Sequence, residues 1–79
     1  MRARVFVTLK PSVFDPQGRT IAEALQSLGY GNVEDVRQGK YFELDLETTE
    51  TAQAQALASE VANRVLANPV IESYRVEIE

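Results

Sequence analysis

The sequence predicts a small α+β domain, because segments in which apolar and polar residues alternate, as in strands, are interspersed along its 79 residues with segments whose apolar residues have helical spacing. The sharpest boundary between two elements lies near the end of the chain. Asn68 can adopt the left-handed conformation that closes a helix, and Pro69 lacks the N–H that a continuing helix needs. Beyond them, apolar and polar residues alternate over residues 73–79, the period of a half-buried strand. A helix followed by a strand is therefore predicted here.

The first part of the chain predicts a strand and then a helix. Apolar residues alternate with polar or aromatic ones over residues 3–9, which indicates a strand. In the helix that follows, Asp15 is the expected N-cap, Pro16 the first helical residue and Gly29 the end. Its apolar stripe has the spacing i, i+4, i+7 and consists of Ile21, Leu25 and Leu28.

The middle of the chain predicts two more strands and a second helix. Residues 33–38 have extended character, and Gly39 and Lys40 are expected to form a tight hairpin. Residues 41–47 alternate clearly and predict the third strand. One of the threonines at 48 and 49 is expected to cap the second helix. The apolar stripe of that helix should comprise Ala54, Leu57, Ala58, Val61, Ala62 and Val65.

This order predicts a single domain over residues 1–79 with a ferredoxin-like βαββαβ fold. In that two-layer sandwich, one antiparallel sheet carries both helices on one face. Its other face would be bare, and that face should carry Arg4, Phe6, Thr8, Tyr41, Glu43, Asp45, Arg75 and Glu77. It is either a solvated face with ion pairs such as Arg4 with Glu77, or an interface anchored by Phe6 and Tyr41. The pattern alone favours the solvated face, since single exposed aromatic residues are common.

The composition excludes several function classes. Twelve acidic and eight basic residues give a net charge of −4, which disfavours binding to nucleic acid. The absence of cysteine and histidine removes thiolate chemistry, the usual general base and the usual transition-metal ligand. No apolar run approaches the roughly 20 residues that a membrane helix needs. A cytoplasmic protein without nucleic-acid or membrane partners is expected.

No group of residues predicts an active site. Glu43, Asp45 and Glu47 share one strand face and could hold a divalent cation, but a charged outer face explains such a row better. Lys10 and Lys40 stand beside turns, where lysines are usually solvated cations. The glycines do not have the spacing of a phosphate-binding loop. We therefore expect no catalytic, cofactor-binding or metal-binding residue, and an interaction or regulatory module.

Several short strings, in this order and over nearly the whole chain, resemble the PurS family. They are Val7-Thr8-Leu9-Lys10, Asp15-Pro16-Gln17-Gly18, Leu28-Gly29-Tyr30, Val36-Arg37-Gln38-Gly39-Lys40-Tyr41 and Leu66-Ala67-Asn68-Pro69-Val70-Ile71-Glu72-Ser73-Tyr74. PurS is the small subunit of phosphoribosylformylglycinamidine synthase in purine biosynthesis. That enzyme converts formylglycinamide ribonucleotide, ATP, glutamine and water into formylglycinamidine ribonucleotide, ADP, phosphate and glutamate.

The resemblance implies a non-catalytic bridge between a PurQ-like glutaminase and a PurL-like synthetase, which would help to deliver ammonia between them. It also implies a homodimer or larger homo-oligomer, and it places ATP and magnesium on the large synthetase subunit. By match to the strings, the candidate partner contacts are Asp15, Gln17, Arg37, Lys40, Asn68 and Tyr74. The oligomer that the resemblance implies favours the bare sheet face as an interface, and the candidates for self-association there are Phe6 and Tyr41. The competing hypothesis is a ferredoxin-like regulatory domain that senses a small molecule.

Overall fold

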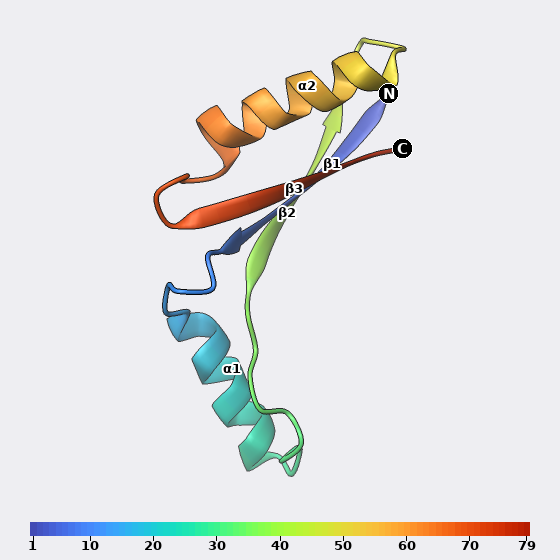
Figure 1. Cartoon of the computed structure of the whole chain (residues 1–79). Coiled ribbons are helices and arrows are strands. Elements are labelled where there is room, and N and C mark those ends of the chain that lie inside the picture. The colour runs from blue at the N-terminus through green and yellow to red at the C-terminus, as the bar shows by residue number, and fades with distance from the viewer.

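The computed structural model describes residues 1–79 and contains three strands and two main helices. Figure 1 shows them in the order β1 (Arg2–Leu9), α1 (Pro16–Ser27), β2 (Gly39–Asp45), α2 (Thr51–Val61) and β3 (Glu72–Ile78). A π-helical turn, η1 (Ala62–Leu66), continues α2. None of the helices has the length and apolar character that a membrane-spanning segment requires.

The strands form one antiparallel sheet in the order β2-β1-β3, with β1 at its centre. Val5 lies opposite Phe42 on one side and Val76 on the other, and Phe6 lies opposite Tyr41 and Arg75. Because neighbouring residues of a strand point to opposite faces, these two rows belong to the two faces of the sheet. The predicted α+β class, with an antiparallel sheet and two helices, is confirmed.

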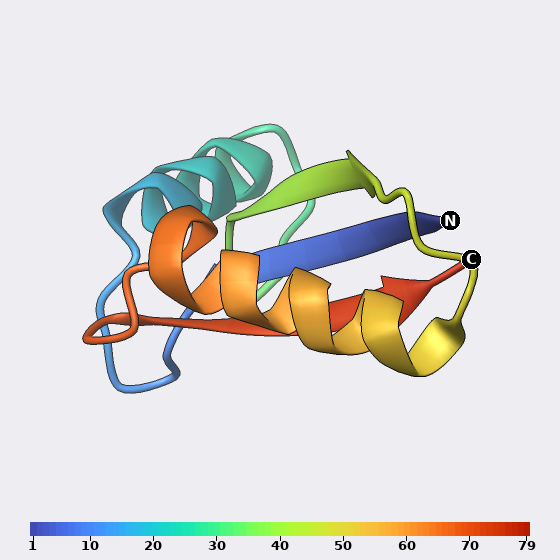
Figure 2. The same cartoon turned by 90° about the horizontal axis from the view of Figure 1, so that it is seen from above.

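Helix α2 covers one face of the sheet, along which it runs in Figures 1 and 2. The face of α2 and η1 that contacts the sheet is made of small residues, since Ala54, Ala58 and Ala62 recur at every fourth position and are fully buried. They allow the helix to approach Val5 and Val7 of β1, which are the largest fully buried side chains. The predicted stripe of six residues is therefore too wide: only its alanines are fully buried, and Leu57 and Val65 are exposed.

The capping residues predicted for α1 are confirmed at both ends. Asp15 is the N-cap, and its Oδ1 accepts the N–H of Gly18 at 2.9 Å. At the other end, Gly29 has a φ of 100°, which glycine adopts without strain. The N–H groups of Gly29 and Tyr30 donate to the carbonyls of Gln26 and Leu25, the pattern of a Schellman motif.

The strand predicted at residues 33–38 is not formed, and neither is the hairpin at Gly39 and Lys40. This segment returns alongside α1, where the Gln26 side chain donates to the Val33 carbonyl, and it has no strand to pair with. Its extended character is real, but a strand requires a hydrogen-bonded neighbour. Gly39 instead begins β2, opposite Thr8 of β1. A Cβ at Gly39 would lie 2.5 Å from the Val7 carbonyl oxygen, so the close approach of two strands requires glycine there.

The end of α2 differs from the prediction in two ways. Ala67 is already extended and its N–H donates to the Ala62 carbonyl, so the helical segment ends at Leu66, two residues before Asn68. Asn68 does not have a positive φ; its Oδ1 accepts the N–H of Val70 and so opens the turn before β3. At the start of α2, neither predicted threonine is the cap, because Glu50 holds that position without a side-chain hydrogen bond.

The chain is elongated, with extents of 48 × 25 × 14 Å. Residues 10–38, here called the arm, carry α1 and the returning segment beyond the end of the sheet, so only α2 covers the sheet within one chain (Figure 1). The radius of gyration is 15.8 Å, against about 12 Å for a compact chain of this length. Only 10 of 79 residues are buried. One chain alone therefore leaves much of its apolar surface in contact with solvent.

Candidate interaction surfaces

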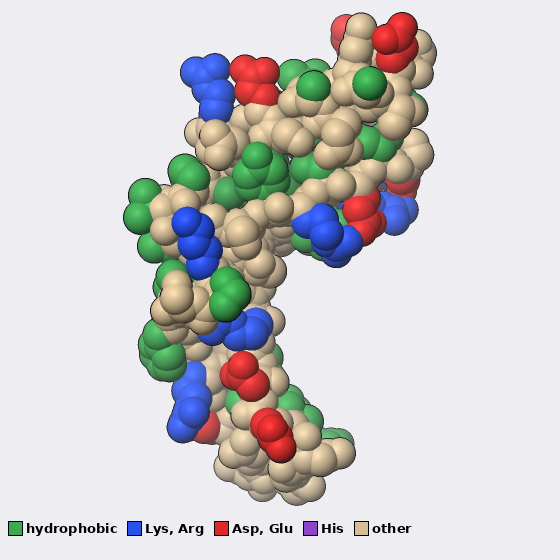
Figure 3. Space-filling view, in the orientation of Figure 1, with side chains coloured by type: hydrophobic (Ala, Val, Ile, Leu, Met, Phe, Trp, Pro, Cys, Tyr) green, Lys and Arg blue, Asp and Glu red, His purple; other side chains and the backbone are tan.

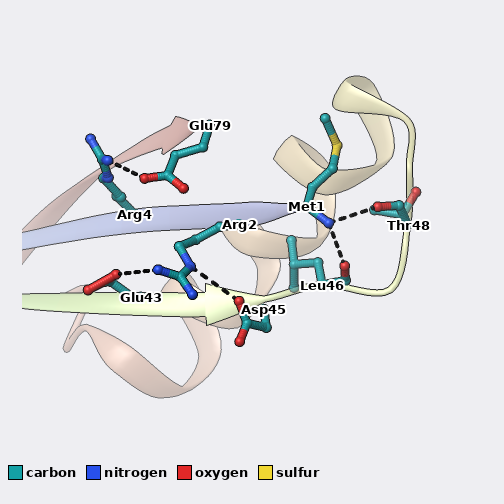
Figure 4. Close-up of polar contacts among 8 residues, drawn as sticks. All are labelled: Met1, Arg2, Arg4, Glu43, Asp45, Leu46, Thr48 and Glu79. Carbon is teal, nitrogen blue, oxygen red and sulfur yellow. Dashed lines mark hydrogen bonds and ion pairs between the residues drawn. The ribbon is translucent and has the colours of Figure 1, made fainter.

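The row of carboxylates on β2 is neutralised by an arginine of β1. Arg2 contacts Glu43 and Asp45 at 3.2 Å each, as Figure 4 shows. The hydrogen bond to Asp45, together with the nearby negative charges, raises the pKa of Arg2. Glu47 lies beyond the end of the strand, and no group of three potential metal ligands is present. The arrangement is that of a charged sheet edge held by ion pairs.

The uncovered face of the sheet carries a cluster of aromatic and cationic side chains, here called the aromatic cluster: Phe6, Tyr41 and Arg75. The rings of Phe6 and Tyr41 lie 5.1 Å apart between centroids and are tilted by 39°. The Arg75 guanidinium lies 4.3 Å from the centre of the Phe6 ring. Tyr41 remains 49% exposed. The two residues predicted for self-association thus come together on an open surface, where aromatic side chains and arginine are suited to anchoring a partner.

Ion pairs border the aromatic cluster on the side of β3. Arg4 pairs with Glu79, and Arg75 pairs with Glu77, so the expected pair of Arg4 with Glu77 is not formed. Arg4 and Glu77 do lie opposite each other in the register. The long side chain of Arg4 reaches past Glu77 to Glu79, next to the end of β3. Glu77 pairs instead with Arg75 on the same strand. Figure 4 shows Arg4 with Glu79.

Three of the predicted partner contacts meet at the base of the arm. Asp15, Gln17 and Lys40 line a cavity of about 190 Å³ together with Gln38 and Glu72. Lys40 Nζ lies 3.5 Å from Oε2 of Glu72, and both side chains line this cavity. The structure thus brings the beginnings of α1, β2 and β3 to one place. In Figure 3 the arm and the sheet together give the molecule a bowed outline with a hollow on one side.

Asp15 is buried and both of its carboxylate oxygens are used. Oδ2 accepts the N–H of Gln38 at 2.7 Å, while Oδ1 accepts that of Gly18. These hydrogen bonds, from Gln38 first and Gly18 second, lower the pKa of Asp15 below its ordinary value of 3.8, and the charge of Arg37 acts in the same direction. Within a single chain this carboxylate joins the start of α1 to the segment that leads into β2.

The remaining predicted contacts lie apart from that cavity. Arg37 is exposed, and its Nη2 donates to the carbonyls of Lys10 and Val13. Asn68 forms the turn before β3, and Tyr74, on β3, is 37% exposed. The candidate partner contacts therefore do not form one site.

A further apolar surface was missed as a candidate because its residues were assigned to the face of α2 that packs on the sheet. Leu57, Val61 and Val65 follow one another at every fourth position beside Glu60 and Arg64, around a hollow of about 360 Å³. Val65 is 76% exposed. The signal was available: the alanines at 54, 58 and 62 form a second stripe of the same spacing, and alanine suits close packing on a sheet. Further exposed apolar residues are Phe14, Ile21, Leu28, Tyr30, Val70 and Ile71.

An α+β chain with few buried residues and several open apolar surfaces has the character of a small assembly subunit. Comparison with known proteins identifies the family. Residues 2–79 match the family model described as "PurS: Phosphoribosylformylglycinamidine (FGAM) synthase". The chain belongs to the PurS family.

Individual relatives agree over nearly the whole length. The phosphoribosylformylglycinamidine synthase subunit PurS of Bacillus subtilis is 46% identical over 78 residues, which are 99% of this chain and 92% of the relative. The corresponding subunit of Synechocystis is 48% identical over 75 residues, which are 95% of this chain and 75% of the relative.

The fold agrees equally well with solved structures. Methanocaldococcus jannaschii PurS superimposes with a TM-score of 0.89 at 36% identity, over 99% of this chain and 94% of that one. A Thermotoga maritima structure described as PurLQS contains a chain that matches with a TM-score of 0.87 at 29% identity, over 96% of this chain and 93% of that one.

Proposed function

We propose that this chain is the non-catalytic bridging subunit of phosphoribosylformylglycinamidine synthase and joins a PurL-like synthetase to a PurQ-like glutaminase. The observation that carries the proposal is the near full-length match to a chain of the PurLQS structure. Subunits of the same enzyme from other organisms support it at 46% and 48% identity.

The surfaces of the chain suit a bridge. Open apolar or aromatic residues occur on the uncovered face of the sheet, on the outer side of α2 and on the arm, so more than one partner can bind at once. In this proposal the ATP and magnesium of the ligase reaction act on the large synthetase subunit. The chain would work in the cytoplasm together with both partners.

Self-association is part of the same proposal. A chain with only 10 buried residues gains stability when a second copy covers its apolar surface. The aromatic cluster is the proposed anchor, because Phe6, Tyr41 and Arg75 already contact one another and need little ordering on association.

Size-exclusion chromatography of the three purified proteins tests the bridge. The synthetase and the glutaminase should elute together only when this chain is present. Stable co-elution of the two large proteins without the chain would contradict a bridging role. The small-molecule sensor is not favoured, since the matched relatives are subunits of one biosynthetic enzyme.

A further inference from the structure

The arm is attached to the sheet at a narrow base. The chain enters it through residues 10–15 and leaves it through residues 36–38, and α1 makes no more than marginal contact with the strands or with α2 (Figure 1). Hollows lie beside this base, one lined by Asp15, Gln38 and Lys40 and another by Pro11, Asp35 and Arg37. The angle between the arm and the sheet therefore depends on whatever ties the two chain crossings to each other.

The first tie runs from the entering crossing to the leaving one. Asp15 is the one buried charged residue of the chain, and its two oxygens have different roles. Oδ1 caps α1 through Gly18, whereas Oδ2 accepts the N–H of Gln38 at 2.7 Å. A helix cap needs only the first of these hydrogen bonds. The second has no role in the helix and joins the crossings.

The second tie runs in the opposite direction. Arg37, on the leaving crossing, donates from Nη2 to the carbonyl of Lys10 at 3.0 Å and to that of Val13 at 2.9 Å. A guanidinium can hold two carbonyls at once because its donors are fixed in a plane. Each crossing thus sends one charged side chain to the backbone of the other. Between them the two backbones pass very close to each other, since a Cβ at Gly18 would overlap the Val36 carbonyl oxygen.

From this reciprocal arrangement we propose that Asp15 and Arg37 are positioning residues that brace the arm at a fixed angle to the sheet before the chain assembles. The use of this brace in assembly rests on the bridging function proposed above. An arm held in place loses less conformational freedom when a partner binds it, so a preset angle strengthens and accelerates assembly. The brace itself is a property of the isolated chain and does not depend on that function.

Pulsed electron paramagnetic resonance can measure the angle directly. The chain has no cysteine, so Ser27→Cys on α1 and Gln55→Cys on α2 would place two spin labels at exposed helix positions. Labelled chain diluted into an excess of unlabelled chain restricts the measurement to distances within one molecule, even in an oligomer. The parent protein should give one narrow distance distribution.

The variants separate the brace from the helix cap. Asp15→Ser keeps a short oxygen that can cap α1, but this oxygen cannot also reach Gln38; Asp15→Asn retains one acceptor oxygen in place of two. Arg37→Gln removes the two carbonyl contacts. Asp35→Asn and Arg19→Gln are the matched controls, because both side chains are exposed on the arm and neither joins the crossings.

In Asp15→Ser and Arg37→Gln, the distance distribution should become at least about twofold wider and the Gln38 amide should exchange about tenfold faster. Helix content by circular dichroism should stay at the parent level, and the controls should match the parent throughout. Distributions as narrow as the parent in both variants would overturn the brace. So would a loss of helix content in step with the broadening, because Asp15 would then act only as a cap.

A second measurement connects the brace to assembly. If the bridge is correct, the braceless variants should join the synthetase and glutaminase about tenfold more weakly than Asp35→Asn does. If variants with a mobile arm bind the synthetase and glutaminase as tightly as the parent does, the preset angle does not strengthen assembly. If no chain binds the partners, the bridging proposal fails, while the distance measurement still decides whether the brace exists.

Discussion

At the base of the arm, the identity of single residues decides whether two stretches of backbone can approach each other. Gly18 sits in the first turn of α1, directly against the Val36 carbonyl, and Gly39 sits against the Val7 carbonyl. Neither has a positive φ, so both are required for space and not for backbone conformation. Asp15 lies between them and satisfies two N–H groups that would otherwise be left without a partner.

Replacing Gly18 should therefore be costly, whereas replacing another glycine of the arm should not. We expect Gly18→Ala to destabilise the chain by about 1–3 kcal/mol, because its methyl group must displace backbone. Gly31→Ala is the control, since nothing lies within 4 Å of its added Cβ. Chemical denaturation followed by circular dichroism measures both. Equal stability of the two variants would contradict the close approach.

Asp15 should also make stability depend on pH. Its pKa is lowered in the folded chain, so its contribution is fully present above the ordinary value of 3.8 and is lost as the pH falls through the lowered value. The free energy of unfolding should therefore decrease between about pH 5 and pH 2. Asp15→Asn should remove part of that slope. The same slope in Asp15→Asn and the parent would show that other carboxylates are responsible.

Among the elements, α2 shows how much of a helix the apolar pattern of its sequence can predict. The pattern places the helix and its buried side correctly, but it merges two stripes, and only the alanine stripe is needed for packing on the sheet. The segment 33–38 shows where a pattern cannot decide. Its extended character is local, whereas strand formation depends on a neighbour that the fold does not bring there.

The alanine stripe predicts a strong size limit on one side of α2. Ala58→Leu should destabilise the chain by about 1–3 kcal/mol, because the fully buried methyl group leaves no room for a longer side chain. Ala56→Leu should change stability by less than about 0.5 kcal/mol, because Ala56 is exposed on the same helix. Thermal unfolding of both variants measures the difference. A tolerated leucine at position 58 would mean that α2 does not lie close against the sheet.

The candidate sites also divide into residues that a local pattern could place and residues that only the tertiary fold brings together. Phe6 and Tyr41 could be placed on one face from alternation alone, and they do contact each other. Asp15 and Gln17 are distant from Lys40 in the chain and meet it only because the arm folds back at its base. The Arg37 contacts to Lys10 and Val13 depend on the same tertiary arrangement, which no local pattern encodes.

For the whole molecule, the elongated shape and the small number of buried residues predict self-association through the aromatic cluster. Sedimentation at decreasing concentration should show a species heavier than the 8.8 kDa of one chain. Phe6→Ala should weaken its association by about tenfold or more, as loss of an interface anchor does. Thr8→Ala, an exposed position on the same face, should leave it unchanged. A parent chain that stays monomeric at all concentrations would contradict this interface.

As a bridging subunit, the chain should connect two enzymes and take no part in the chemistry. The direct test is the rate of formylglycinamidine ribonucleotide formation by the synthetase and glutaminase, with and without this chain, using either glutamine or ammonium as the nitrogen source. We expect the glutamine-dependent rate to require the chain and the ammonium-dependent rate of the synthetase to be independent of it. Full glutamine-dependent activity without the chain, or a requirement for the chain with ammonium, would contradict the claim.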